Sequence, residues 1–229
     1  MIKEFNDFCD KLESYSQLRQ DLFVLFCLGR NPGYFVEFGA CDGIELSNTY
    51  LLEKEFLWKG ILAEPAKIWQ YQLKNNRPNA SIETLCVADK SGDTVKFLEI
   101  PGQEALSGIE QYSYFDAHAE TRKNIGQTYN VDTISLNDLL DKHNAPDVID
   151  YMSIDTEGSE LSILQNYNFS RKFKVLTIEH NETVNRGPLE DIMKKNGYVN
   201  VLPEESRWDG WFLSEDTVNN LNRKLGIVC

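Results

Sequence analysis

The chain lacks the features that mark several common classes of protein. Among its 229 residues there is no C-x-x-C pair, so neither a structural zinc site nor a disulfide framework is predicted. The longest apolar run, residues 22–28, is far too short to span a bilayer, and no basic-then-apolar leader opens the chain. We therefore expect a soluble cytoplasmic protein without membrane insertion. Its thiols should be reduced: Cys9, Cys27, Cys41, Cys86 and Cys229.

Positive charge is also scarce. The sequence has 23 Lys and Arg residues against 36 Asp and Glu residues, a formal net charge of −13. Proteins that bind nucleic acids present a basic face to the phosphates, so we expect no nucleic-acid partner. The charge balance does not bear on a small ligand held in a local pocket, and it does not predict an oligomeric state.

Alternation of strand-like and helix-like patterns is what the sequence does contain. Apolar residues recur every three or four positions over residues 1–30, which predicts one helix that ends at Asn31-Pro-Gly33. Without a linker or an internal repeat, the rest predicts one α/β domain at 34–229 behind an N-terminal helical extension at 1–33. Apolar runs predict core strands at 35–38, 60–65, 81–88, 148–155 and 174–179, and an antiparallel edge at 198–202 and 211–213.

Three local features lie between these strands. Ser47 is a plausible N-cap for a helix that runs to Phe56. The turn at 89–92 predicts that strand 81–88 forms a hairpin with 94–100. Residues 101–128 have no regular pattern and are rich in aromatic and polar residues, among them Phe115 and His118, so they form either a substrate-facing loop or a variable surface loop.

The stretch from Tyr34 to Gly43 carries the clearest motif. An apolar strand runs into Glu37 and then a turn with the spacing Glu-x-Gly-x-x-x-Gly. Glycine frees the backbone at 39 and 43 to turn sharply. Position 41, where a dinucleotide-binding G-x-G-x-x-G turn has its second glycine, is Cys. A pyrophosphate needs a glycine-rich helix N-terminus and tolerates a carboxylate poorly, so this turn points away from a dinucleotide.

Acidic residues follow nearly every predicted core strand. In an open α/β sheet, ligands lie beyond the carboxyl ends of the strands, so these groups should share one pocket. A single acid at a strand end is more often a helix cap or a surface group, but five such ends together predict an acid-lined site. It suits a positively charged cofactor with hydroxyls, such as S-adenosylmethionine (SAM). The strand ends are Glu37, Glu64, residues 87–89, Asp155 with Glu157, and Glu179 with His180 and Asn181.

Five segments together resemble the FkbM-type family of class I SAM-dependent methyltransferases: residues 35–43, 47–50, 60–65, 76–78 and 153–160. The resemblance extends over residues 34–213 and implies a Rossmann-like class I fold. The first-strand acid and its loop would hold the amino-acid part of SAM, the second-strand acid the ribose, and the third-strand end would border the adenine. The cofactor residues so implied are Glu37, Gly39, Ala40, Asp42, Gly43, Ser47, Glu64, Pro65, Val87, Ala88 and Asp155. Ser153 departs from the family, because many relatives have Lys there.

The implied reaction is O-methylation of a hydroxyl on a sugar, a glycan or a polyketide-like small molecule. An alcohol needs a base to take its proton. His180 is the first candidate, although it could equally cap its strand, and Asp155 and Glu157 are alternatives. We expect no metal; the alternative is Mg²⁺ on oxygens of Asp155, Glu179 and Asn181.

Two other functions compete with methyl transfer. An NAD-dependent oxidoreductase would use a similar fold, but Cys41 and the additional acids disfavour it. A non-catalytic module that keeps the fold as a binding surface is disfavoured by the acids at all strand ends.

Overall fold

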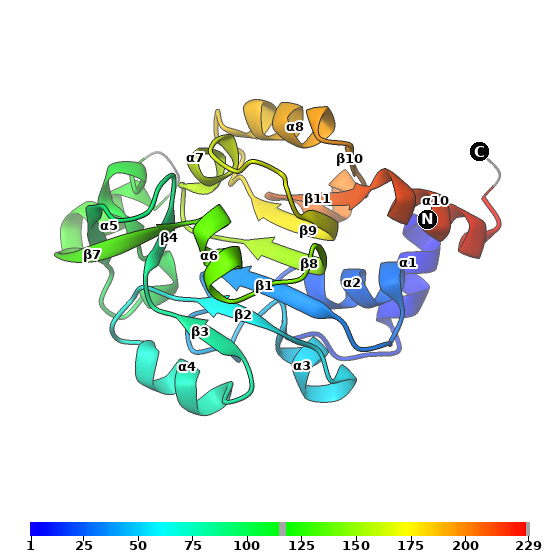
Figure 1. The fold of residues 1–229 in the computed structure, drawn as a ribbon, viewed down its shortest axis with the longest axis horizontal. Coiled ribbons are helices and arrows are strands. Elements are labelled where there is room, and N and C mark those ends of the chain that lie inside the picture. The colour runs from blue at the N-terminus through cyan, green and yellow to red at the C-terminus, as the bar shows by residue number, and fades with distance from the viewer. Residues whose placement is uncertain (115–117, 228–229) are drawn as a thin grey trace.

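A seven-stranded sheet forms the centre of the computed structural model, which describes residues 1–114 and 118–227; Phe115 and Cys229 lie outside these ranges. The strands lie in the order β10-β11-β9-β8-β1-β2-β3 (Figure 1). Neighbours from β9 to β3 are parallel, and β11 runs antiparallel between β9 and β10. The predicted, mostly parallel sheet with an antiparallel C-terminal edge is confirmed. Its strands are β1 (Tyr34–Phe38), β2 (Lys59–Ala63), β3 (Ser81–Glu83), β8 (Val148–Ile154), β9 (Lys172–Glu179), β10 (Tyr198–Asn200) and β11 (Asp209–Ser214).

Alternate residues of the central strands face two opposite helical layers. In β1, Val36 and Phe38 belong to one apolar cluster and Phe35 to the other. This period of two is what a sheet covered on both faces requires. One layer contains α6 (Leu136–Lys142), α7 (Glu160–Gln165) and α8 (Arg186–Lys195). The other contains α1 (Ile2–Cys9), α2 (Gln20–Leu28), α3 (Tyr50–Phe56), α4 (Gln70–Asn76) and α10 (Glu215–Leu225).

The N-terminal region is two helices, so the predicted single helix over 1–30 is wrong. Between α1 and α2 the chain turns around Asp21, whose carboxylate accepts hydrogen bonds from Ser14 Oγ at 2.6 Å and Tyr15 N at 2.9 Å. Helix α2 is buried from Gln20 to Cys27 and packs on the sheet, where Phe23 stacks on Trp211. Among the described residues, none of the helices combines the length and apolar character needed to cross a membrane.

A smaller sheet lies beside the carboxyl ends of the central strands, at the left of Figure 1. Its order is β4 (Cys86–Ala88), β7 (Gln127–Ser135), β5 (Thr94–Glu99) and β6 (Gly108–Ile109). The predicted strand 81–88 is wrong, because Thr84 N and Leu85 N turn back to the Glu83 carboxylate and divide it into β3 and β4. The predicted hairpin is also wrong: β5 pairs with β7 and β6.

Short helical turns complete the chain. The turns η1 (Glu104–Leu106) and η2 (Glu110–Tyr112) and helix α5 (Ala119–Ile125) lie in the segment without a sequence pattern, and α9 (Pro203–Ser206) precedes β11. This segment brings η1 to the carboxyl ends of the central strands, where both line one cavity.

Candidate functional site

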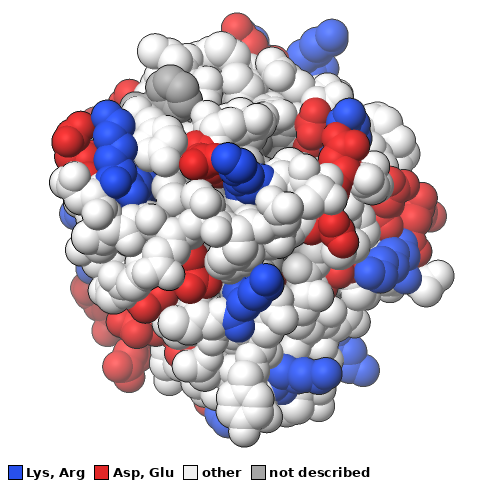
Figure 2. Space-filling model, turned by 90° about the vertical axis from the view of Figure 1, so that its left-hand side faces the viewer, with Lys and Arg blue, Asp and Glu red and all other residues white. Residues whose placement is uncertain are grey.

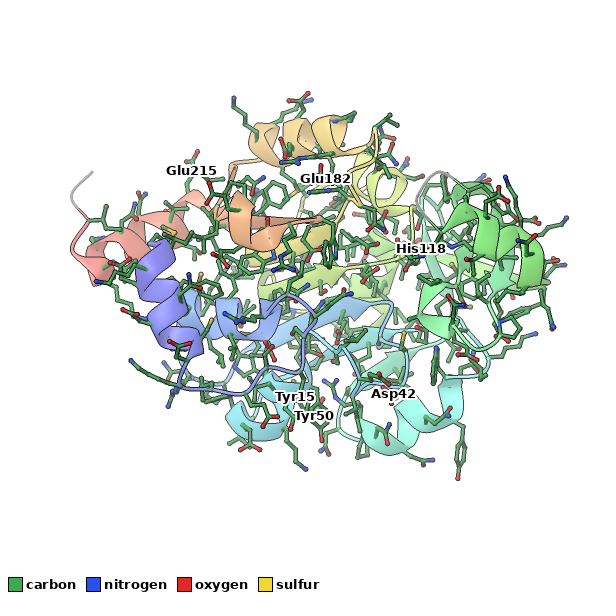
Figure 3. The ribbon with its side chains drawn as sticks, turned by 180° about the vertical axis from the view of Figure 1, so that it is seen from behind. Tyr15, Asp42, Tyr50, His118, Glu182 and Glu215 are labelled. Atoms are coloured by element: carbon green, nitrogen blue, oxygen red, sulfur yellow. The ribbon has the colours of Figure 1, made fainter. Side chains whose placement is uncertain are left out.

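A large cavity lies at the carboxyl ends of β1, β2, β8 and β9. Its volume is about 930 Å³, within the range of small-molecule sites. Figure 2 views the molecule from the left-hand side of Figure 1, and Asp and Glu side chains reach the surface at several places there. Figure 3 labels three lining residues from separate segments, Asp42 after β1, His118 before α5 and Glu182 after β9. The predicted convergence of the strand ends on one pocket is confirmed.

Glu37 holds the loop that follows β1. Its side chain is 2% exposed, and its oxygens accept hydrogen bonds from Asn48 N at 2.6 Å, Ser47 Oγ at 3.1 Å and Thr49 Oγ1. Burial raises the pKa of Glu37. Because residues 47–49 fold around this carboxylate, α3 begins at Tyr50 instead of directly after Ser47, although Ser47 Oγ still accepts from Tyr50 N at 3.1 Å.

Arg77 completes this buried network. Its guanidinium is 1% exposed and donates to Glu53 Oε2 at 2.7 Å, Gly43 O at 2.9 Å and Thr49 Oγ1 at 3.0 Å. Its positive charge also opposes the rise that burial causes in the pKa of Glu37. The residue after α4 therefore ties the first loop of the cavity to α3.

The two glycines of the first loop are required by packing against the protein itself. Gly39 has φ +72°, and a Cβ there would lie 2.0 Å from Asp155 O at the end of β8. Gly43 has φ +82°, and its Cβ would lie 2.7 Å from the Arg77 side chain. A backbone that approaches its neighbours this closely leaves no room for a side chain.

We expect Gly39→Ala to destabilise the protein far more than Gly92→Ala. Gly92 has φ +82° but nothing within 4 Å of its Cβ, so its substitution reports backbone strain alone, about 1 kcal/mol. Gly39→Ala adds a clash with backbone and should cost at least about 2 kcal/mol more. Urea denaturation measures both variants. Equal losses in the two variants would mean that the loop does not approach Asp155 this closely.

Glu64 joins the end of β2 to the first loop. Its carboxylate accepts hydrogen bonds from Cys41 N at 2.9 Å and Ala66 N at 2.7 Å. Cys41 has φ +46°, and it occupies the position where a dinucleotide turn has glycine. Burial, with a smaller contribution from the charge of Glu99, raises the pKa of Glu64 to about 7. Carboxylate oxygens accept more than one hydrogen bond, so Glu64 retains acceptor capacity toward the cavity it lines.

Three carboxylates meet at the ends of β8 and β9. One oxygen from each of Asp155, Glu157 and Glu179 lies within 4.8 Å of the other two. Burial, followed by the charges of Asp209 and Glu160, raises the pKa of Asp155 to about 7. Burial and the neighbouring carboxylates raise the pKa of Glu179 as well. This end of the cavity is therefore strongly acidic.

Arg122 connects the segment before β7 to this acidic region. It is 1% exposed and donates to Leu106 O at 2.9 Å, Ser113 O at 3.3 Å and Glu157 Oε2 at 2.5 Å. Because Leu106 itself lines the cavity, the ion pair holds that part of the wall against the end of β8.

His180 does not line the cavity. It is 4% exposed, its backbone N–H donates to Trp208 O at 2.9 Å, and its Nδ1 accepts from Glu182 N at 3.1 Å. Burial lowers the pKa of His180. Its contacts are those of a residue that holds the turn after β9, so the geometry gives no support to His180 as the base.

The remaining predicted site residues divide into lining and supporting positions. Asp42, Ser47, Pro65 and Val87 line the cavity, as do the five predicted acids Glu37, Glu64, Asp155, Glu157 and Glu179, together with Gly39 and Asn181. Ala40, Gly43 and Ala88 are not among the residues that line it. Several lining residues carry no signal in the sequence that marks them as functional: Gln17, Gln20, Trp69 and Phe97.

Comparison with known proteins places this geometry in a family. Residues 37–199 match the family model of the methyltransferase FkbM domain. A search of curated proteins found no significant match. The structure is similar to precorrin-6y C5,15-methyltransferase of Geobacter metallireducens, with 10% identity, coverage of 90% of this chain and 94% of that chain, and a TM-score of 0.42.

Two further solved structures are similar at the same level. For a TehB-like SAM-dependent methyltransferase of Corynebacterium glutamicum, the identity is 8%, the coverage 93% of this chain and 95% of that chain, and the TM-score 0.43. For the fibrillarin pre-rRNA processing protein of Methanococcus jannaschii, the identity is 10%, the coverage 86% of this chain and 73% of that chain, and the TM-score 0.43.

The family match covers most of the chain, from Glu37 in β1 past the end of β9. It includes the first loop, Glu64 and Asp155, which the structure brings to one cavity. The family match and the order of the seven-stranded sheet confirm the expected Rossmann-like class I methyltransferase fold, and membership of this family implies SAM as the cofactor. The chain belongs to the FkbM methyltransferase family.

Proposed function

We propose that the protein catalyses SAM-dependent O-methylation of a hydroxyl on a sugar, a glycan or a polyketide-like small molecule. The observation that carries this proposal is the charge of the cavity: among the described residues that line it, nine carry carboxylates and none is Lys or Arg. This lining suits a cationic cofactor and an uncharged acceptor, and it opposes a phosphate backbone. The nine are Glu37, Asp42, Glu45, Glu64, Glu104, Asp155, Glu157, Glu179 and Glu182.

The residues present fit SAM. Asn48 Oδ1 is buried and has no hydrogen-bond partner among the described residues, so this oxygen can accept a hydrogen bond from the ammonium group of SAM. The Glu64 carboxylate can accept hydrogen bonds from ribose hydroxyls, and Val87 and Phe97 offer apolar contacts for the adenine ring of SAM. When bound, SAM supplies an electrophilic methyl group. The first-loop residues Ala40 and Gly43 would support the site without lining it.

Asp155 is our candidate for the group that accepts the proton of the acceptor hydroxyl. It lines the cavity at the end of β8, and a base with a pKa near 7 is matched to neutral pH. Glu157 is the less suitable alternative, since its carboxylate is already paired with Arg122.

Other lining residues support a sugar-like acceptor. Trp208 offers an aromatic face, and Gln17 and Asn181 offer amides that both donate and accept hydrogen bonds, whereas the buried Gln20 amide is already bonded to Leu18 N and Asp209. A hydroxyl-rich ring can satisfy both kinds of contact without bringing charge. Trp211, in contrast, is fully buried in the core, where it stacks on Phe23.

Methyl transfer from labelled SAM tests the acceptor class. One set of candidate methyl acceptors contains sugars, glycans and polyketide-like molecules, and the other set contains RNA. Label transfer to a hydroxyl of the first set supports the proposal. Transfer to RNA alone would contradict it and would make the acidic cavity a poor guide to the acceptor.

Cofactor affinity should depend on pH through Glu64. A carboxyl with a pKa of about 7 is mostly protonated at pH 6 and mostly ionised at pH 8, and the ionised form is the stronger acceptor for ribose hydroxyls. We therefore expect S-adenosylhomocysteine (SAH) to bind several-fold more tightly at pH 8, up to about tenfold. Calorimetry on Glu64→Gln should show weaker binding with a flattened pH profile. The same pH dependence in both proteins would mean that another group titrates.

A further inference from the structure

The three carboxylates at the ends of β8 and β9 form a compact cluster of oxygens. Asp155 and Glu157 come from the loop after β8, and Glu179 is the last residue of β9. One oxygen of each lies within 4.8 Å of the others. Two oxygens bound to one Mg²⁺ or Ca²⁺ at about 2.1–2.4 Å lie at most about 4–5 Å apart, so the spacing fits a single cation.

A second observation is independent of that spacing. Glu179 is 9% exposed, and its Oε2 is buried without a hydrogen-bond partner among the described residues. Buried carboxylate oxygens are normally satisfied by a donor or by a cation. Glu179 also lines the cavity, so a ligand has access to it. Asp155, Glu157, Glu160 and Asp209 all add negative charge around Glu179, and Arg122, which is paired with Glu157, offsets only part of it. The remaining negative charge favours a cation of charge above one.

We propose that Asp155, Glu157 and Glu179 bind one divalent cation with a preference for oxygen ligands, such as Mg²⁺, Mn²⁺ or Ca²⁺. Carboxylates alone, without His or Cys in the cluster, are the ligands of hard cations. The sequence-based alternative used Asn181 as the third ligand; the structure brings Glu157 to that role. A cation bound here would polarise an acceptor hydroxyl, and Asp155 would then serve as its ligand and no longer as the group that takes the proton. This consequence rests on the proposed methyl transfer, whereas the binding itself does not.

Titration of the EDTA-treated 229-residue chain with Mn²⁺, followed by electron paramagnetic resonance of the free ion, tests the proposal. We expect one site per chain that Mg²⁺ or Ca²⁺ displaces. Glu179→Gln and Asp155→Asn should each weaken Mn²⁺ binding at least about tenfold. Glu182→Gln is the matched control, because Glu182 lines the same cavity but its carboxylate pairs with Arg186 at 2.9 Å. That variant should stay within about twofold of the parent.

Two results would overturn the proposal: no Mn²⁺ binding at millimolar concentration, or an equal loss in Glu182→Gln and Glu179→Gln, which would mean diffuse attraction to an acidic surface. Thermal unfolding checks that each variant is folded. SAH titration of the same samples separates the two claims, since SAH binding without Mn²⁺ binding removes the cation site and leaves the methyltransferase function intact.

Discussion

Asp155→Asn is expected to lower the rate of methyl transfer by about 10²–10⁴-fold, the usual contribution of a general base. An amide has the size of the carboxylate but cannot take the acceptor proton. Asp155 lines the cavity beyond β8, and its pKa of about 7 keeps a proton-accepting fraction at neutral pH. The rate is measured with labelled SAM and the acceptor that gives turnover, and SAH affinity is measured beside it. We expect the turnover number to fall far more than the SAH affinity.

Asp150→Asn provides the control on the same strand. Asp150 lies near the other end of β8, where it accepts hydrogen bonds from Tyr34 N at 2.8 Å and Lys174 Nζ at 2.7 Å, away from the cavity. Its amide variant should keep the rate within about twofold, since Asp150 does not line the cavity and an amide oxygen can still accept from Tyr34 N. If Asp155→Asn retained full activity, the proton would leave through another group, and our assignment of the base would be wrong.

Arg77→Leu is expected to destabilise the protein by about 3–5 kcal/mol, because removal of one partner leaves buried charges uncompensated. The guanidinium is 1% exposed, pairs with Glu53 and lies close enough to Glu37 to oppose the rise in its pKa. Leucine fills part of the volume but leaves Gly43 O and Thr49 Oγ1 without their donor. Urea denaturation gives the change in free energy of unfolding.

Arg186→Leu is the matched control for Arg77. Arg186 also pairs with two carboxylates, Glu182 and Glu190, but its side chain is 38% exposed. Water screens such pairs, so the loss should stay below about 1 kcal/mol. Comparable losses in both variants would contradict the idea that burial makes the Arg77 network indispensable to the first loop.

Much of the fold was readable from periodicity, because strands buried on both faces leave short apolar runs in the sequence. The positions where a side-chain hydrogen bond interrupts a helix or a strand could not be predicted from the sequence. Asp21 divides the N-terminal helical pattern by drawing Ser14 and Tyr15 into a turn, and Glu83 ends a strand by capturing the next two N–H groups. Such interactions depend on where a carboxylate folds back, which hydrophobic pattern does not encode.

The sequence predicted those parts of the candidate site whose position follows from the order of the parallel strands. Parallel strands bring their carboxyl ends together, so Glu64, Asp155 and Glu179 could be placed at one edge from their order alone. The role of each carboxylate was not readable. Glu37 proved to be occupied by residues 47–49, and His180 turned away from the cavity. Both outcomes depend on side-chain packing, which only the three-dimensional arrangement determines.

Residues outside the family match also complete the cavity. Gln17 lies in the turn before α2, Gln20 is the first residue of α2, and Trp208 lies in the segment before β11. Gln17 and Gln20 lie outside the motifs in sequence, and nothing in their local pattern marks them. Acceptor choice should therefore depend on parts of the chain that the shared domain does not contain.

Calorimetric titration with SAH and with NAD tests the central claim most directly. The cavity is acid-lined, and its first loop has Cys41 where a dinucleotide turn has glycine. We predict that one SAH binds per chain, that NAD gives no binding heat, and that Glu64→Ala weakens SAH binding by about 1–3 kcal/mol through loss of charged hydrogen bonds. Tight NAD binding without SAH heat would contradict the account.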